Sequence, residues 1–261
     1  LISNLNANMK SVIVIGSGFA GLSSAAFLAK AGYDVTVLEK NDSLGGRARV
    51  WETEGFKFDM GPSWYWMPDV FERYFKSFGY DVSDLYELVR LDPSYRVVFV
   101  PNDHEDQSAN MTELEAMFER LDPGSSERLK KFLAEAAYKY EVGIKDLVHK
   151  PSRSLLEFAD FRILKGLFQL DLLKDMRKHV AEVSTHPKLK AIMEFPVLFL
   201  GALPQNTPAL YSLMNYADMS LGTWYPRGGM HKIIEAMVKV AKELGVKFRT
   251  KAEVKGFKYS G

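Results

Sequence analysis

The sequence predicts an α/β protein in which a Rossmann-like parallel sheet is interrupted by a largely helical insertion. The first observation is a βαβ pattern, in which Ser11–Ile15 and residues 33–38 are β-branched runs around a small-residue segment. Such runs are typical of strands buried on both faces of a parallel sheet. The second is a helical period over residues 111–186, and the third is the return of α/β character after residue 222. We expect three segments: a nucleotide-binding segment at 9–93, the insertion at 94–221 and a return to the first domain at 222–261.

A dinucleotide fingerprint follows the first strand at once. In Gly16-Ser-Gly18-Phe-Ala-Gly21, the first glycine allows a tight turn and the second lets the backbone approach a pyrophosphate. Gly21 lets the following helix lie close to the strands, and the helix N-terminus faces the phosphates. Glu39 ends the second strand, where the fingerprint places an acid that binds the ribose hydroxyls. A carboxylate there would repel a 2′-phosphate, which argues against NADP.

A second glycine pair distinguishes this chain from an ordinary NAD-binding fold. Gly45-Gly46-Arg47 follows the ribose acid closely, and Gly61-Pro62-Ser63 lies shortly after. The pair and its arginine resemble the GG-R element of the flavoprotein amine oxidase and carotenoid desaturase superfamily. That resemblance implies a loop along the pyrophosphate of FAD, backed by Arg47, so we expect FAD as the cofactor. The residues expected to hold it are Gly16, Gly18, Phe19, Ala20, Gly21, Glu39, Lys40, Gly45, Gly46, Arg47, Gly61, Pro62, Ser63 and Val254.

The composition argues against several classes of function. The formal net charge of the 261 residues is +1, which gives no electrostatic case for nucleic acid. The absence of cysteine excludes disulfides and thiolate nucleophiles. No stretch reaches the roughly 18 apolar residues that a spanning helix needs. We expect no metal, because the histidines show no ligand spacing and four of them lie in polar helical or loop surroundings; these four are His104, His149, His179 and His186.

The elements after the fingerprint are predicted in chain order. Residues 49–58 alternate loosely and predict paired strands, and residues 69–78 predict a short helix. Residues 95–100 form a β-branched run that Pro101 ends, and residues 102–110 are expected to be a polar loop.

Capping signals place the first helices of the insertion. Thr112 with Glu115 three positions later matches a capping box. Ser125 or Ser126 is expected to cap the next helix, which runs to about Val148. After the insertion, we expect a helix over 231–244 and strands over 246–249 and 253–259.

One stretch of the insertion has two possible interpretations. Residues 155–180 carry an apolar stripe with cationic edges, as a helix lying on a membrane surface does. An amphipathic helix docked on its own protein has the same pattern. The stripe consists of Phe161, Leu164, Phe168, Leu172, Met176 and Val180. We expect a protein that associates peripherally with the inner, cytoplasmic face of the membrane.

Three separated motifs resemble the carotenoid desaturase family, in particular its bacterial phytoene desaturases. They are Gly61-Pro-Ser-Trp-Tyr-Trp66, Asn206-Thr-Pro-Ala-Leu-Tyr-Ser212 and Trp224-Tyr-Pro-Arg-Gly-Gly-Met230. The resemblance covers nearly the whole chain but only about the first half of the family's length. We therefore expect this sequence to be the N-terminal part of a longer protein.

The resemblance implies a reaction in which a C–C single bond of a long apolar polyene becomes a double bond: FAD accepts a hydride from one of its carbons, and a proton leaves the adjacent carbon. The candidates for the wall of a substrate tunnel are Trp64, Tyr65, Trp66, Trp224 and Tyr225. Core aromatic residues are the alternative reading of Tyr65 and Trp66. No catalytic residue is assigned, because His231 opens a helix, where a capping role is more common. Nothing in the sequence specifies the oligomeric state.

Other functions share this pattern. A later-step carotenoid desaturase, acting on γ-carotene or a hydroxylated carotenoid, and a carotenoid isomerase are the main alternatives to phytoene desaturation. An amine oxidase would need a polar or anionic patch, of which the apolar stretch 195–203 gives no sign. A non-catalytic lipid escort of the same fold is disfavoured by the retention of Glu39 and of Gly45-Gly46-Arg47.

Overall fold

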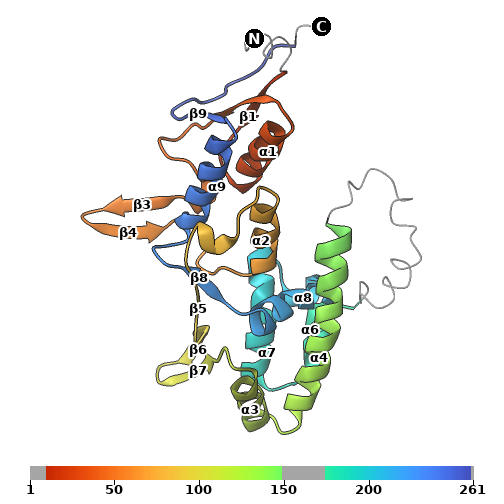
Figure 1. Ribbon diagram of the computed structural model, residues 1–261. Coiled ribbons are helices and arrows are strands. Elements are labelled where there is room, and N and C mark those ends of the chain that lie inside the picture. The colour runs from red at the N-terminus through yellow and green to blue at the C-terminus, as the bar shows by residue number, and fades with distance from the viewer. Residues whose placement is uncertain (1–9, 149–173, 260–261) are drawn as a thin grey trace, which may run out of the picture. The chain divides into compact units, whose positions relative to one another are not determined.

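The computed structural model describes residues 10–148 and 174–259 (Figure 1). The chain divides into two compact units: unit 1 comprises Leu1–Val89 and Tyr225–Gly261, and unit 2 comprises Arg90–Trp224. The divisions expected from the sequence fall after residues 93 and 221. The chain leaves unit 1 through β5 (Leu88–Arg90) and returns through β8 (Trp224–Pro226), and these two strands pair.

Unit 1 is built on a three-stranded parallel sheet. Strands β1 (Ser11–Ile15), β2 (Asp34–Leu38) and β9 (Lys247–Arg249) lie in the order β1-β2-β9. Helix α1 (Phe19–Lys30) makes the crossover from β1 to β2, and α9 (His231–Glu243) precedes β9. The predicted α/β fold with a parallel sheet is therefore confirmed.

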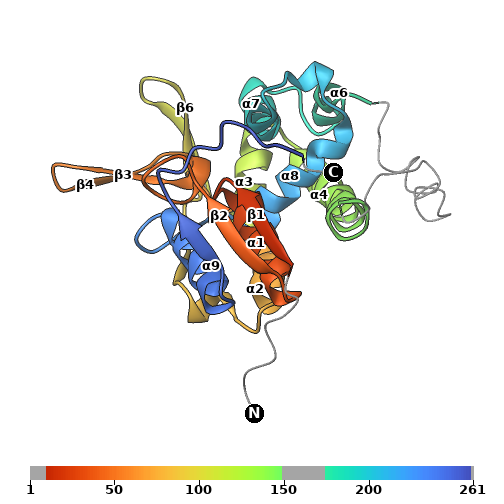
Figure 2. The same ribbon diagram turned by 90° about the horizontal axis from the view of Figure 1, so that it is seen from above.

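Small side chains bring the helices of unit 1 close to the sheet. Helices α1 and α9 pack side by side (Figure 2). The buried residues between the helices and strands are Ala25, Ala26, Val35, Val37, Ala241 and Val246. At the start of α1 the approach is closest, because a Cβ atom on Gly21 would lie 2.0 Å from the carbonyl oxygen of Gly16.

A hairpin and a short helix complete the part of unit 1 that precedes β5. Strands β3 (Val50–Thr53) and β4 (Phe56–Asp59) pair antiparallel, as the alternation predicts. Helix α2 (Pro68–Lys76) begins at the proline and buries Phe75. One face of the hairpin carries Trp51 opposite Phe58, both exposed, with ring centroids 5.3 Å apart.

Unit 2 is mainly helical. It contains α3 (Met111–Leu121), α4 (Ser125–Tyr140), α6 (Met176–Ala181), α7 (Pro187–Glu194) and the short α8 (Leu213–Asn215). Wide π-helical turns follow α4 over Glu141–Leu147 and α8 over Tyr216–Ser220. The core lies between these helices, and its most buried members include Phe118, Leu129, Met176, Val180, Leu189 and Met193.

The prediction of a polar loop over residues 102–110 is wrong. Residues Asp103–Gln107 form strand β7, which pairs antiparallel with β6 (Tyr95–Val100). The polar side chains are tolerated because they find partners: Lys188 of α7 bonds Asp103 and also Glu105, the latter at 3.1 Å. A hydrophobicity pattern does not report such long-range pairing.

The helix caps also differ from the expected ones. Helix α3 is capped by Asn110, whose side chain accepts a hydrogen bond from the backbone N–H of Thr112 at 2.9 Å. Helix α4 is preceded by Gly124 in the left-handed region, so Ser125 lies inside the helix. Residues 253–259, expected to be a strand, have no regular secondary structure.

The members of the predicted amphipathic stripe before residue 174 lie outside the described residues, and its last two, Met176 and Val180, lie within them. There, Asp175 has extended backbone and caps α6, so no helix continues through it. Met176 and Val180 are fully buried in the core of unit 2 and do not face solvent. No helix in the described ranges has the length and apolar character to cross a bilayer. Membrane association stays a prediction.

Replacing Gly21 by alanine should destabilise unit 1. The new Cβ would overlap the carbonyl oxygen of Gly16. Because this is a backbone atom, no change of side-chain rotamer can relieve the overlap. We expect a loss of about 3 kcal/mol, the upper end of overpacking costs, in the free energy of unfolding by urea. Gly256→Ala is the control, because its Cβ would meet nothing within 4 Å. Equal stability of the two variants would contradict this packing.

Candidate cofactor site

A cavity of about 560 Å³ opens at the carboxyl ends of β1 and β2. This is the edge of a parallel α/β sheet where ligands bind. Its walls come from the loop after β1, the end of β2, the turn after it and the segment after β9. The lining residues are Ile15, Gly16, Ser17, Gly18, Leu38, Glu39, Lys40, Asn41, Gly46, Arg47, Arg49, Ala252, Glu253 and Val254.

Two glycine loops form the floor of this cavity. The N–H of Gly16 donates to the carbonyl of Leu38 at 2.8 Å, and its φ of +93° is one that glycine adopts without strain. A Cβ on Gly46 would lie 3.0 Å from the Cα of Gly18, so the loops touch backbone to backbone. Helix α1 begins directly after Gly18, and the N–H groups of its first turn have no intrahelical partners. This arrangement is suited to binding a phosphate.

Glu39 is buried, and both oxygens of its carboxylate accept hydrogen bonds. Oε2 accepts from the backbone N–H of Ser17 at 3.0 Å and from its hydroxyl at 2.6 Å. Oε1 accepts from the backbone N–H of Asn41 at 3.0 Å and from its side-chain amide at 2.6 Å. Burial alone would raise the pKa of Glu39, but these four bonds outweigh it and lower the pKa to about 2. The site therefore presents a fixed negative charge beside the loop after β1, residues 16–18, which is called the phosphate loop below.

The structure gathers half of the predicted cofactor residues at the cavity. Those that line it are Gly16, Gly18, Glu39, Lys40, Gly46, Arg47 and Val254. Val254 lies there because the chain after β9 runs beside the end of β2, where the N–H of Ala252 donates to the carbonyl of Glu39 at 2.8 Å.

The other predicted cofactor residues are not in the lining. They are Phe19, Ala20, Gly21, Gly45, Gly61, Pro62 and Ser63. Gly61 has a supporting position instead, because its Cβ would lie 2.1 Å from the carbonyl oxygen of Arg47. It allows the chain after the hairpin to pass directly against the glycine–arginine turn.

Sequence reasoning missed Ser17, Asn41 and Arg49. Ser17 is the variable position inside the fingerprint, and Asn41 follows the ribose acid by two residues. Arg49 holds the second loop, since its Nε donates to the carbonyl of Gly46 at 2.9 Å. Arg47 also lines the cavity, so two arginines lie at this site. The sequence signal that could have identified these three residues is their polar character within or beside the glycine motifs. The motifs themselves do not require polar residues at these positions.

Residues of the 224–230 motif bond the segments next to the second glycine loop. The hydroxyl of Tyr225 donates to Asp59 Oδ2, which also accepts from the backbone N–H of Met230 at 3.0 Å. His231 Nδ1 lies 3.1 Å from the carbonyl oxygen of Ala48. The end of the hairpin, the second glycine loop and the start of α9 are thereby tied together, which gives Tyr225 a structural role.

The remaining aromatic candidates have different surroundings. Tyr65 is buried, with its hydroxyl 2.9 Å from that of Tyr86, so it packs as a core residue of unit 1. Trp64 and Trp66 stack with centroids 5.9 Å apart and are only partly buried. The indole N–H of Trp224 donates to the carbonyl of Leu221 at 2.9 Å.

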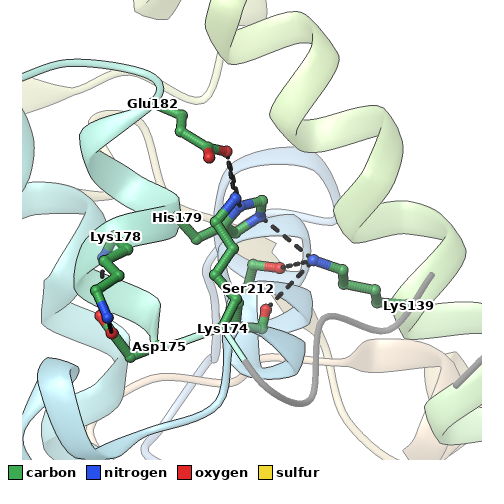
Figure 3. Close-up of polar contacts among 8 residues, drawn as sticks. Lys139, Lys174, Asp175, Lys178, His179, Glu182 and Ser212 are labelled. Atoms are coloured by element: carbon green, nitrogen blue, oxygen red, sulfur yellow. Dashed lines mark hydrogen bonds and ion pairs between the residues drawn. The ribbon is translucent and has the colours of Figure 1, made fainter. Parts of the chain in front are cut away.

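His179 lies on α6 among charged side chains, and the sequence gives no sign that it is buried. Its ring is buried against Phe132, with centroids 4.7 Å apart, and its Nε2 lies 3.3 Å from Nζ of the buried Lys139. Figure 3 shows this ring between Lys139 and Glu182, with Ser212 Oγ 3.3 Å from the same Nζ. These contacts join α4 and α6 to the turn before α8. They stabilise the core of unit 2.

The other histidines do not form a site. His104 lies on β7, His186 precedes α7, and His149 lies outside the described residues. Within residues 10–148 and 174–259, no three His, Asp or Glu side chains are placed to hold a metal ion.

A second buried carboxylate lies in unit 2. Asp218 accepts hydrogen bonds from the hydroxyls of Tyr95 at 2.5 Å and Thr223 at 3.0 Å. Burial raises the pKa of Asp218 to about 6, although the two hydrogen bonds oppose the shift. Near neutral pH the Asp218 carboxyl is therefore ionised, and burying this charge lowers the stability of the fold.

The lowered pKa of Glu39 predicts a pH-dependent contribution to stability. A carboxyl with a folded pKa near 2 and an unfolded pKa of 4.5 stabilises the fold above pH 4.5 and loses that contribution as pH falls through 2. Urea unfolding should show wild type more stable than Glu39→Gln by about 3 kcal/mol at pH 6 and about 1.5 kcal/mol at pH 3. Glu72→Gln, on the exposed side of α2, is the control. A difference that does not change with pH would contradict the assignment.

The raised pKa of Asp218 predicts the opposite slope. Its stabilising contribution is complete below its unfolded pKa of 3.8 and is lost as pH rises through about 6. Between pH 4 and pH 8 the free energy of unfolding of wild type should fall by about 2.5 kcal/mol relative to Asp218→Asn. The exposed Asp42→Asn is the matched control and should follow wild type. Parallel profiles for wild type and Asp218→Asn would show that burial does not perturb this carboxyl.

Comparisons with known proteins agree with this geometry. The family model described as "Flavin containing amine oxidoreductase" matches residues 19–261. The chain is 43% identical to a carotenoid 3,4-desaturase of Haloarcula japonica, over 93% of this chain and 49% of the relative. It is 34% identical to a zeta-carotene-forming phytoene desaturase of Myxococcus xanthus, over 93% of this chain and 47% of the relative.

The comparison with solved structures supports the fold. A crystal structure of an oxidoreductase from Methanosarcina mazei matches with a TM-score of 0.56 at 20% identity, over 93% of this chain and 51% of that one. The chain thus spans about half the length of the curated relatives it matches. The resemblance stated from the motifs is confirmed, and the chain belongs to the flavin containing amine oxidoreductase family.

Proposed function

We propose that the protein binds FAD and uses it to desaturate a carotenoid. The observation that carries the proposal is the cavity at the ends of β1 and β2. It combines two glycine loops, the N-terminus of α1, the fixed carboxylate of Glu39 and two arginines, Arg47 and Arg49. These groups fit an adenosine diphosphate moiety. The relatives named as carotenoid desaturases support the choice of substrate class.

Each group has a task in binding the cofactor. The backbone around Gly16 and Gly18 leaves room for the pyrophosphate, and Arg47 and Arg49 neutralise its charge. Glu39 accepts hydrogen bonds from the ribose hydroxyls and repels a 2′-phosphate. When bound, FAD supplies the oxidation by accepting hydride.

The substrate is a long hydrocarbon, so its recognition requires apolar surface and not charge. A polyene delocalises the positive charge that develops when hydride leaves an allylic carbon. The protein then has to hold the reacting bond near the flavin and exclude water. Such a reaction requires no nucleophilic side chain.

A second candidate concerns the position of the new double bond. The identity of 43% to a carotenoid 3,4-desaturase exceeds the 34% to a phytoene desaturase. This difference favours a later-step desaturation over the phytoene desaturation that the motifs alone suggest. Both reactions place a long polyene against the same cofactor.

The test loads the full-length protein with FAD and supplies phytoene or a monocyclic carotenoid in liposomes. Each added double bond lengthens the conjugated system, so turnover should shift the absorption to longer wavelength. A shift with phytoene alone supports the first candidate, and one with the later carotenoid alone supports the second. Glu39→Ala should bind FAD about 10-fold or more weakly, as loss of a hydrogen bond to a charged group predicts. Full-length protein that takes up no flavin, or oxidises amines and neither carotenoid, would overturn the proposal.

A further inference from the structure

Ser17 occupies the point where three segments of the cofactor site meet. Its side chain is completely buried, although a serine at a variable motif position is often solvated. The hydroxyl donates to Glu39 Oε2 at 2.6 Å and accepts from the N–H of Gly45 at 3.2 Å. The Gly45 N–H also donates to the backbone carbonyl of Ser17 at 3.0 Å. The loop after β1, the end of β2 and the second glycine loop are therefore joined at Ser17, and its hydroxyl contacts both of the other segments.

The two halves of the Glu39 carboxylate are held differently. The donors to Oε1 come from Asn41, only two residues along the chain. The donors to Oε2 come from Ser17, on the loop that contacts the phosphates in the proposed function. Local donors fix the carboxylate relative to its own turn. The contact that sets its direction relative to the phosphate loop is the one from Ser17.

The direction of the hydrogen bonds strengthens this contact. The Gly45 N–H donates to the serine oxygen, which makes the serine O–H a stronger donor to the negatively charged oxygen of Glu39. A hydrogen bond to an ionised acceptor is about twice as strong as one between neutral groups. Alanine at position 17 would remove both side-chain bonds, to Glu39 and from Gly45. It would keep the backbone bonds, from the Ser17 N–H to Glu39 and from the Gly45 N–H to the Ser17 carbonyl.

We propose that Ser17 is a positioning residue that orients the Glu39 carboxylate toward the ribose hydroxyls of the bound cofactor. The inference rests on the proposed binding of an adenine dinucleotide. It adds that the fingerprint position between Gly16 and Gly18, which the glycine motif leaves open, determines how strongly the site discriminates a ribose diol. Ser17 acts through Glu39 and not by contact with the ribose.

The test compares two ligands that differ only in the groups Glu39 would bind. The affinities of ADP and of 2′,3′-dideoxy-ADP are measured by calorimetry for wild type, Ser17→Ala and the control Ser24→Ala, which changes an exposed serine on α1. Ser17→Ala should weaken ADP about 10-fold and the dideoxy compound less than 2-fold, because only ADP uses the oriented carboxylate. Ser24→Ala should leave both affinities unchanged.

A double-mutant cycle separates positioning from general damage to the loop. In a Glu39→Gln background, Ser17→Ala should change ADP affinity less than 2-fold, because the charge that Ser17 orients is already gone. An equal loss with and without Glu39 would show that Ser17 acts on the phosphate loop, and would overturn the inference.

A measurement without any ligand completes the test. The pKa of the Glu39 carboxyl, followed by carbon NMR, should rise in Ser17→Ala because a hydrogen bond to the charged form is lost, and should not move in Ser24→Ala. Wild type that binds ADP and dideoxy-ADP equally would refute the ribose role of Glu39 in the proposed function. Wild type that prefers ADP, with an unchanged preference and an unchanged Glu39 pKa in Ser17→Ala, would refute the inference alone.

Discussion

The buried carboxylate of Glu39 is the constraint on which the cofactor site depends. An ionised group removed from water is costly unless its oxygens find donors, and here four N–H and O–H groups supply them. Those donors come from the loop after β1 and the turn after β2, so neither loop can move without exposing the charge. The carboxylate thus fixes the phosphate loop before any ligand arrives. Preorganisation of this kind lowers the entropic cost of binding.

Around this carboxylate the site is built from backbone contacts. Gly21 lies against the carbonyl of Gly16, Gly46 against the Cα of Gly18, and Gly61 against the carbonyl of Arg47. At each point a side chain would separate two segments that have to touch. Asp59 then ties the hairpin to the start of α9 through Tyr225 and Met230. Segments more than 160 residues apart in sequence support the same loop.

The parts of the fold that the sequence predicts are those that local pattern determines. The parallel strands, the fingerprint turn and strand β6 follow from β-branched runs and adjacent glycines or proline. The errors occur where a distant partner decides. Residues 103–107 form a strand because they pair with β6 and because Lys188 donates to Asp103 and Glu105. The burial of His179 against Lys139 and Phe132, which the sequence does not indicate, also depends on distant partners. Ser17 was missed for the same reason, since its partners Glu39 and Gly45 lie 22 and 28 residues away.

This difference explains why the cofactor is easier to infer than the substrate. A charged dinucleotide is bound by directional groups, and those groups lie on short loops that keep a fixed spacing in sequence. An apolar polyene is bound by buried area, which any set of large side chains can supply. The aromatic residues chosen for that purpose illustrate the problem. Tyr65 belongs to the core with Tyr86, and Tyr225 bonds Asp59, so aromatic character alone did not separate a packing residue from a binding one.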